Sequence, residues 1–325
     1  MNQYARLTVW SGAVLFAIAA MSPAMAQQWP SRTIAINTAT APGGSSDTVG
    51  RLIANRLSER LKVPVIIQYN PSAAGIAAYS RVAKAPGDGY TALIVNASAG
   101  IQAALRSDLE FDVTRDYATV ATFVTYPFLL SVRPDSPIKT FAELLARVKA
   151  APPRTFTYAI TSVGSSHHLL GEWINLEAGI DMQYVPYRGA ATQVVDVLAG
   201  RVDVMVEPLT TGLSRVQSGQ LRALAVSSLK RYATLPDVPA VAEFLPEVSM
   251  DSWLGLVMPK STPRPIVDRL NAEIRGILNA QDVKDQLAKL GNTIIISTPD
   301  EMQARIVREV AAYKKVVDAK GIKPE

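Results

Sequence analysis

Two short runs of glycine and serine hold the residues best suited to chemistry in this sequence. The first, PGGSS at 42–46, follows an apolar, β-prone segment at 33–36 and precedes a helical pattern of apolar residues. The second, GSS at 164–166, lies between a similar segment at 156–160 and another helical pattern. A helix N-terminus offers unpaired N–H groups and the positive end of the helix dipole, and glycine lets a ligand approach the backbone. Both turns therefore favour the binding of an anion.

A single turn of this kind is more often a simple helix cap, because serine, glycine and aspartate are common at that position. Two such turns, far apart in the sequence and each within a strand–turn–helix unit, indicate more. They predict a cleft between two α/β units that closes on a small acidic molecule. The elements that position them alternate between strands and helices from residue 32 onward. This alternation predicts parallel sheets with helices on both faces.

Residues for catalysis are few. The sequence has no cysteine and only two histidines, His167 and His168, which are neighbours on the second helix. Neighbouring helical residues point about 100° apart, so they form a poor metal pair. A Ser–His–Asp triad can be drawn from Ser45 or Ser165 with His168 and Asp203, but hydroxyl groups that bind an anion explain the same serines without a base. We therefore predict no catalytic residue, metal site or cofactor.

The two histidines are expected to differ in their surroundings. His168 is expected to be a buried, hydrogen-bonded residue of its helix. His167 is expected to face the cleft, where a partly protonated imidazole would attract a carboxylate.

A third candidate lies where a strand ending at Tyr187 leads into a helix starting at Ala190. Ligands bind at such strand ends in open α/β sheets. Gly189 and Ala190 can present N–H groups there, and Tyr187 a ring and a hydroxyl. Arg188 either faces the ligand or is solvated. Asp203 follows in an apolar strand and needs a partner if it is buried, so it either contacts the ligand or holds a turn in place.

The first 26 residues have the pattern of a secretory signal peptide. Arg6 supplies the positive start, 7–20 is apolar, and AMA at 24–26 is a cleavage site. We expect cleavage after Ala26, export and a periplasmic location. The formal net charge of +5 becomes +4 once Arg6 is removed. The basic side chains are scattered without a block of like charge, so nucleic acid is not an expected partner.

Several further motifs occur in order along the chain. They are APGGSSD at 41–47, PGDGY at 86–90, GSS at 164–166 with His168, VPYRG at 185–189, GRVD at 200–203, LRALAV at 221–226, LPDVP at 235–239 and WLGL at 253–256. With these motifs the sequence resembles the Bug-type solute-binding proteins, which are the periplasmic receptors of tripartite tricarboxylate transporters. The resemblance covers essentially the whole chain after residue 26.

The resemblance implies an α/β, two-lobed type II periplasmic-binding-protein fold (a Venus flytrap), in which each lobe is a mainly parallel sheet flanked by helices. Lobe 1 is expected at 27–126 plus 250–325, and lobe 2 at 127–249. The lobes would hold a small carboxylate through backbone amides, hydroxyls and bridging waters, without catalysis. The expected partners are the membrane permease subunits of a tripartite tricarboxylate transporter, and the protein is expected to be a monomer. A sensor kinase as partner, or a periplasmic hydrolase on the same fold, stays open.

Two positions depart from the usual pattern of that family. Thr40 stands where relatives carry a bulky aromatic side chain, and His167 where they commonly carry serine. A roomier pocket with an added imidazole favours a dicarboxylate, or an aromatic acid such as a phthalate-type diacid. The predicted ligand-binding residues are Thr40, Pro42, Gly43, Gly44, Ser45, Ser46, Gly164, Ser165, Ser166, His167, Tyr187, Arg188, Gly189, Ala190 and Asp203.

Overall fold

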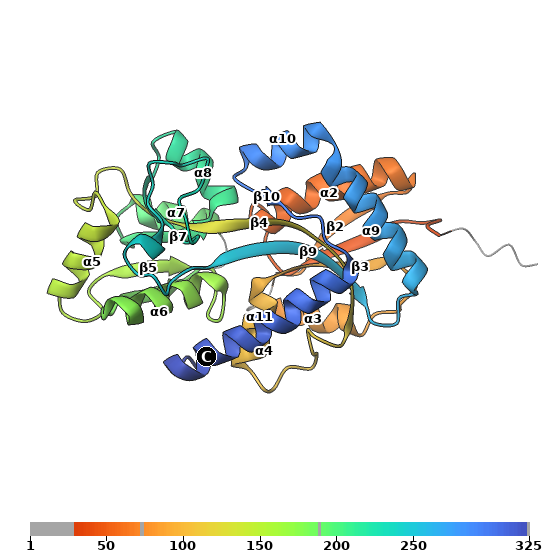
Figure 1. Cartoon of the computed structure of the whole chain (residues 1–325), viewed down its shortest axis with the longest axis horizontal. Coiled ribbons are helices and arrows are strands. Elements are labelled where there is room, and N and C mark those ends of the chain that lie inside the picture. Colours follow the sequence, from red (N-terminus) through yellow and green to blue (C-terminus); the bar gives the residue numbers. More distant parts are fainter. Residues whose placement is uncertain (1–28, 72–74, 188–189, 324–325) are drawn as a thin grey trace, which may run out of the picture.

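The computed structural model describes residues 29–71, 75–187 and 190–323. The signal peptide predicted at 1–26 and the candidates Arg188 and Gly189 lie outside these residues. Figure 1 shows an elongated molecule in which long strands connect two halves. Within the described ranges, no helix combines the length and the apolar character needed to cross a membrane.

The first half starts with three strand–helix units. These are β1 (Ile34–Thr38) with α2 (Ser45–Leu61), β2 (Val65–Tyr69) with α3 (Ile76–Ala83), and β3 (Thr91–Asn96) with α4 (Ala97–Leu105). Strand β1 lies between β2 and β3 and pairs with both in parallel. Helix α2 covers this sheet because its buried stripe of Val49, Ile53 and Leu57 recurs at helical spacing.

Strand β4 (Tyr117–Val132) connects the two halves. From Tyr117 to Pro127 it pairs antiparallel with β9 (Asp251–Pro259). From Phe128 onward it pairs with β7 (Val204–Pro208) and β8 (Arg222–Val226) of the second half. Figure 1 shows β4 and β9 as two long arrows across the middle of the molecule. Because β4 belongs to both sheets, it fixes one half against the other along a continuous backbone.

The second half is built from the intervening segment. Its elements are α5 (Phe141–Ala150), β5 (Thr157–Ile160), α6 (Ser166–Ala178), β6 (Gln183–Pro186), α7 (Ala190–Leu198), β7 (Val204–Pro208), α8 (Leu209–Gln217), β8 (Arg222–Val226) and the short 3-10 helix η2 (Val241–Glu243). Strand β5 pairs in parallel with β6 and β7. The core of this half includes Phe128, Phe141, Tyr158 and Leu170, each at most 1% exposed.

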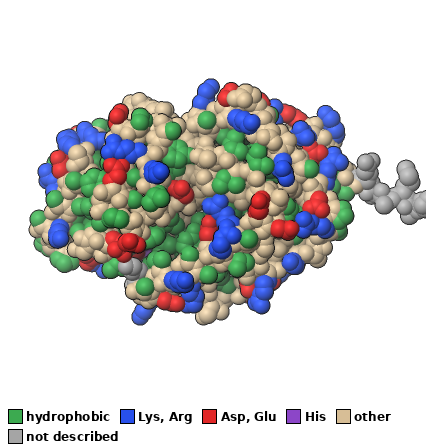
Figure 2. Space-filling model, in the orientation of Figure 1, with side chains coloured by type: hydrophobic (Ala, Val, Ile, Leu, Met, Phe, Trp, Pro, Cys, Tyr) green, Lys and Arg blue, Asp and Glu red, His purple; other side chains and the backbone are tan. Residues whose placement is uncertain are grey.

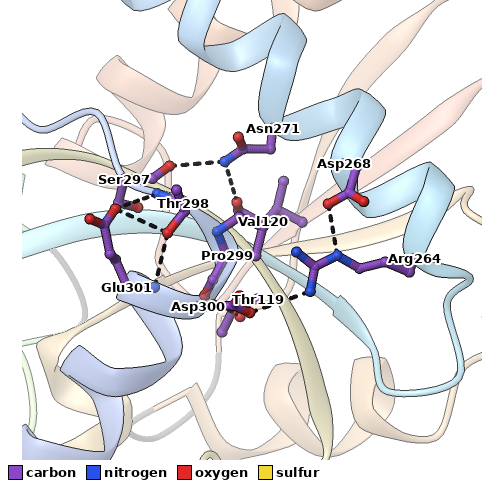
Figure 3. A network of polar contacts seen from close by, with 10 residues as sticks. All are labelled: Thr119, Val120, Arg264, Asp268, Asn271, Ser297, Thr298, Pro299, Asp300 and Glu301. Carbon is purple, nitrogen blue, oxygen red and sulfur yellow. Dashed lines mark hydrogen bonds and ion pairs between the residues drawn. The ribbon is translucent and has the colours of Figure 1, made fainter.

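The C-terminal segment returns to the first half. It comprises α9 (Arg264–Asn279), α10 (Gln281–Lys289), β10 (Thr293–Ile294) and α11 (Pro299–Lys320). Figure 3 shows how polar contacts anchor it: Asn271 Nδ2 donates to the carbonyls of Val120 and Ser297 at 2.8 and 2.9 Å. Thr119 Oγ1 donates to the carbonyl of Pro299 at 2.8 Å. These bonds join the start of α11 and the middle of α9 to strand β4.

The parallel pairing predicted from the alternation of strands and helices is present in each half, but it is not complete. Strands β4 and β9 run antiparallel to their neighbours because they carry the chain from one half to the other, so both sheets are mixed. Two α-helices of the described residues were not predicted: α4 and α8. On the face seen in Figure 2, basic and acidic side chains are interspersed.

Candidate ligand-binding site

A pocket of about 830 Å³ lies between the two halves, which is ample for a small organic ligand. It opens at the carboxyl ends of β1, β3 and β5, where α2, α4 and α6 begin. The polar residues that line it include Thr40, Ser45, Ser46, Asn96, Ser98, Gln102, Arg106, Tyr126, Thr161, Ser162, Ser165, Ser166, His167, Tyr187, Gln193, Thr211 and Ser252. Among the described lining residues no carboxylate occurs, and Arg106 is the only side chain with a fixed charge.

The first corner is the turn between β1 and α2, which contains the PGGSS motif at 42–46. An aspartate holds this turn in place. Gly43 has a φ of +87°, and its N–H donates to Asp47 Oδ2 at 2.8 Å. Asp47 Oδ1 also accepts from the Tyr69 hydroxyl at 2.6 Å and from Arg51 Nε at 2.5 Å. Burial raises the pKa of Asp47, but these hydrogen bonds outweigh it and lower that pKa below its ordinary value. The corner therefore keeps a carboxylate anion behind the pocket wall, and Gly44 caps the helix.

The second corner, between β5 and α6, repeats this arrangement with a histidine. Gly164 has a φ of +71°, and its N–H donates to His168 Nδ1 at 3.2 Å. Ser165 is the N-cap of α6, and its Oγ accepts from the His168 N–H at 3.3 Å. His168 is 4% exposed, so the prediction of a buried, hydrogen-bonded histidine is confirmed. Because Nδ1 accepts a hydrogen bond, the ring carries its proton on Nε2.

Helix α4 forms a third corner, which follows β3. Asn96 is its N-cap, and the Asn96 side chain accepts from the Ser98 N–H at 2.9 Å. Further along α4, Gln102 Nε2 donates to the carbonyl of Gly164 at 2.9 Å, and Ser98 Oγ lies 3.3 Å from Ser166 Oγ. Helix α4 thus follows a strand of the first half but supports the second corner directly.

The fold agrees with the comparisons to known proteins. The family model of the tripartite tricarboxylate transporter family receptor matches residues 49–322. BugT of Bordetella pertussis is 32% identical over 305 residues, which is 93% of this chain and 93% of BugT. This chain belongs to the tripartite tricarboxylate transporter receptor family.

Solved structures show the same architecture as this receptor. A protein of R. palustris solved with adipate is 31% identical, with a TM-score of 0.87 over 91% of this chain and 100% of that protein. MatC from Rhodopseudomonas palustris, solved with bound malate, is 28% identical, with a TM-score of 0.84 over 89% of this chain and 100% of MatC. The periplasmic binding protein BugD is 27% identical, with a TM-score of 0.86 over 91% and 100% of the two chains. The receptor therefore has the two-lobed periplasmic-binding-protein fold that its sequence predicts.

His167 lines the pocket of the receptor, but its expected partial charge is wrong. The residue is 9% exposed, its ring packs edge-on against Phe128 with 5.0 Å between centroids, and its Nδ1 lies 3.2 Å from Thr161 Oγ1. Burial lowers the pKa of His167 to about 4, so the imidazole is neutral at pH 7. It offers the pocket a hydrogen-bonding nitrogen and no positive charge.

The serine-histidine-aspartate triad drawn from the sequence does not assemble. Asp203 lies before β7, and its Oδ2 accepts from the N–H and Oγ1 of Thr157 at 2.8 and 2.9 Å. Thr157 begins β5, whereas the pocket lies at the opposite, carboxyl end of that strand. His168 Nδ1 accepts from the backbone N–H of Gly164 at 3.2 Å, so this nitrogen is engaged by the backbone. Asp203 holds two strand starts together, away from the pocket.

The structure brings most of the predicted ligand-binding residues to one pocket, from both halves. Those that line it are Thr40, Pro42, Gly44, Ser45, Ser46, Gly164, Ser165, Ser166, His167 and Tyr187. Gly43 is exposed and is not among the lining residues, and its N–H donates to Asp47. Tyr187 offers its ring, because its hydroxyl donates to Asp196 at 2.7 Å. Burial, together with the bond to Asp196, raises the pKa of Tyr187 to about 12. Ala190 is the first residue of α7.

Sequence reasoning missed the residues that reach the pocket from α4 and from the crossing strands. Ser98, Gln102 and Arg106 come with α4, for which Asn96 after a buried strand was an available start signal. Tyr126 of β4 and Ser252 of β9 line the pocket where these strands cross between the halves. Burial raises the pKa of Tyr126, while the Ser252 and Ser45 hydroxyls beside it act in the opposite direction. No local pattern marks these two positions.

Proposed function

We propose that this receptor captures a small carboxylate in the 830 Å³ pocket, with one carboxylate group held by the corners that open α2 and α6. The observation that carries the proposal is the meeting of two helix N-termini on a pocket whose described lining contains no acidic residue. Backbone N–H groups and serine hydroxyls at a helix start bind an anion without a cation. The related structures with adipate and malate, both dicarboxylates, support the same class of ligand.

A second carboxylate on the ligand would lie toward Arg106. This side chain lines the pocket at the end of α4, and its Nε and Nη2 donate to Asp108 at 2.9 and 2.7 Å. An aromatic acid such as a phthalate-type diacid has matching surfaces in Tyr79, Tyr126, Phe128 and Tyr187. Because His167 is neutral, no imidazolium would attract a second carboxylate. Arg106 would therefore be the group that attracts it.

The receptor would act after export, with its signal peptide removed after Ala26, as a periplasmic monomer without catalytic activity or cofactor. It would deliver its ligand to the membrane permease subunits of a tripartite tricarboxylate transporter, as the family description indicates. The corresponding division into lobes is 27–126 with 250–325, and 127–249. The change of pairing partners of β4 between Pro127 and Phe128 supports this boundary.

The test is a calorimetric titration of the exported protein with aliphatic dicarboxylates, aromatic mono- and diacids and amino acids. We expect stoichiometric binding of one acid class, with the ligand recovered unchanged. A ligand that binds the folded state alone also raises the melting temperature. Turnover of the bound acid would overturn the receptor role, and binding of only uncharged solutes would overturn the carboxylate role.

A matched pair of variants tests the corners themselves. Ser162→Asp adds a negative charge at the second corner, where Ser162 lines the pocket and is half-buried. Thr140→Asp adds the same charge at the N-cap of α5, and Thr140 is not one of the pocket-lining residues. We expect the first variant to weaken carboxylate binding at least a hundredfold by repulsion, and the second to leave it unchanged. Equal affinities in both variants would contradict the proposed anion site.

A further inference from the structure

Gln193 is a buried amide without a hydrogen-bond partner in the described structure. It lies on α7, is 1% exposed and lines the pocket, yet neither its Oε1 nor its Nε2 is bonded. His167, on α6, has the same property at one atom, because its Nε2 is buried without a partner. Unsatisfied buried polar atoms cost free energy, so they are rare and call for a specific explanation.

Other buried amides of this chain have their partners within the protein. Asn175 donates to the carbonyl of Met182 at 2.9 Å and accepts from the Met182 N–H at 3.0 Å. Gln102 and Asn271 donate to backbone carbonyls. Gln193 differs from these three in lacking a bond at either end. Its place in the pocket wall makes a bound molecule the natural partner.

Gln193 and His167 belong to neighbouring parts of the second half. Helix α6 follows β5, helix α7 follows β6, and β5 and β6 pair in parallel. The carboxyl ends of parallel neighbours lie at the same sheet edge, so both side chains reach the pocket from that edge. Arg106, the charged lining residue, reaches it from α4 of the first half.

The free atoms define the chemistry of a partner. The Gln193 amide offers a donor and an acceptor, and the neutral His167 ring offers one further nitrogen. A carboxylate only accepts, so it would leave Gln193 Oε1 unpaired. An alcohol or carboxamide both donates and accepts, and it carries no charge that the wall would have to balance.

We propose that Gln193 and His167 form a neutral subsite that binds an uncharged donor–acceptor substituent, an alcohol or a carboxamide, on the captured carboxylate. This inference rests on the proposed capture of a carboxylate at the two corners. It assigns different tasks to the two halves of the pocket. The corners hold the acid group, and Gln193 with His167 selects among acids by what else they carry.

The test compares two pairs of acids that differ by one added hydroxyl: succinate with malate, and phthalate with 4-hydroxyphthalate. A third pair, glutarate with glutaramate, replaces one carboxylate with a carboxamide. We expect the wild-type protein to bind the substituted member of at least one pair tenfold or more tighter. Gln193→Met, which keeps the length of the side chain and removes the amide, should abolish that preference. His167→Phe should reduce the preference and keep the packing on Phe128.

Unliganded stability provides the second readout. Gln193→Met removes an unpaired buried amide, so its melting temperature should equal or exceed that of the wild type. Asn175→Leu, the control, removes an amide bonded at both ends and should lower it. A preference that survives in Gln193→Met, or a melting temperature lowered as much as in the control, would overturn the subsite. Absence of binding by every acid, substituted or not, would instead overturn the proposed carboxylate capture.

Discussion

The two corners of the pocket share a backbone design and differ in how it is anchored. In each, a glycine with positive φ donates its N–H to the side chain four residues later, Gly43 to Asp47 and Gly164 to His168. The first acceptor is a carboxylate tied to Tyr69 and Arg51 of its own half. The second acceptor is an imidazole that accepts at Nδ1. Its corner is also bonded to α4, because Gln102 donates to the carbonyl of Gly164.

The first corner is therefore held by contacts within its own half, whereas the second depends on a helix that follows a strand of the other half. Asp47 keeps the first loop in place through contacts within α2 and β2 alone. The second corner is complete only when α4, which follows a strand of the other half, lies against it. Ile101 of α4 is also part of the second hydrophobic core. We infer that the second corner responds more strongly to changes at the contact between the halves.

The largest expected difference comes from adding one methyl group to each glycine. A Cβ at Gly43 meets no atom within 4 Å, whereas at Gly164 it would overlap Gln102 Nε2 and lie 2.9 Å from Leu105 Cδ1. Gly43→Ala should cost about 1–2 kcal/mol from its left-handed backbone alone. Gly164→Ala adds overpacking and should cost roughly 2–5 kcal/mol. Urea unfolding of both variants measures this, and equal losses would show that α4 does not constrain the second corner.

Acid should distinguish the corners next. The pKa of His167, about 4 in the folded protein, lies below its ordinary value near 6.5, so the unfolded chain takes up the proton first. The contribution of His167 to stability is complete above pH 6.5 and falls by about 3 kcal/mol as the pH drops to 4. The pKa of Asp47 is lowered from 3.8, so its contribution is lost only as the pH falls below that value.

Urea unfolding at pH 7, 5 and 4 measures this effect. Between pH 6.5 and 4, His167→Phe should lose much less stability than the wild type, because phenylalanine does not titrate. Asp47→Asn should be less stable than the wild type at every pH and should keep the loss over the same interval. An unchanged slope in His167→Phe would mean that the buried imidazole is protonated as readily as in the unfolded chain.

The corners were predictable because their signals are local. A β-prone segment, a glycine, serines and an apolar helical stripe lie within some twenty residues, and each part has a fixed role at a helix start. Helix α4 carries a weaker signal. Its sequence ASAGIQAAL is dominated by small residues, so an apolar stripe hardly stands out, although Asn96 is a good cap.

Properties that depend on the meeting of distant segments were not predictable. Tyr126 and Ser252 line the pocket only because β4 and β9 cross there together. The neutral state of His167 follows from burial against Phe128, which pattern alone does not reveal. The unpaired amide of Gln193 likewise becomes visible only when all its surroundings are known.

The smallest expected effect tests whether α4 is a third working corner. Asn96 caps α4 by accepting from the Ser98 N–H at 2.9 Å, and Thr140 caps α5 by accepting from the Glu143 N–H at 3.1 Å. Asn96→Ala and Thr140→Ala should each cost about 1 kcal/mol in urea unfolding, because both remove one N-cap bond. Only Asn96→Ala should also weaken ligand binding, since Asn96 and Ser98 line the pocket and Ser98 contacts Ser166. Equal affinity in the two variants would mean that α4 acts as a support behind the second corner and does not hold ligand itself.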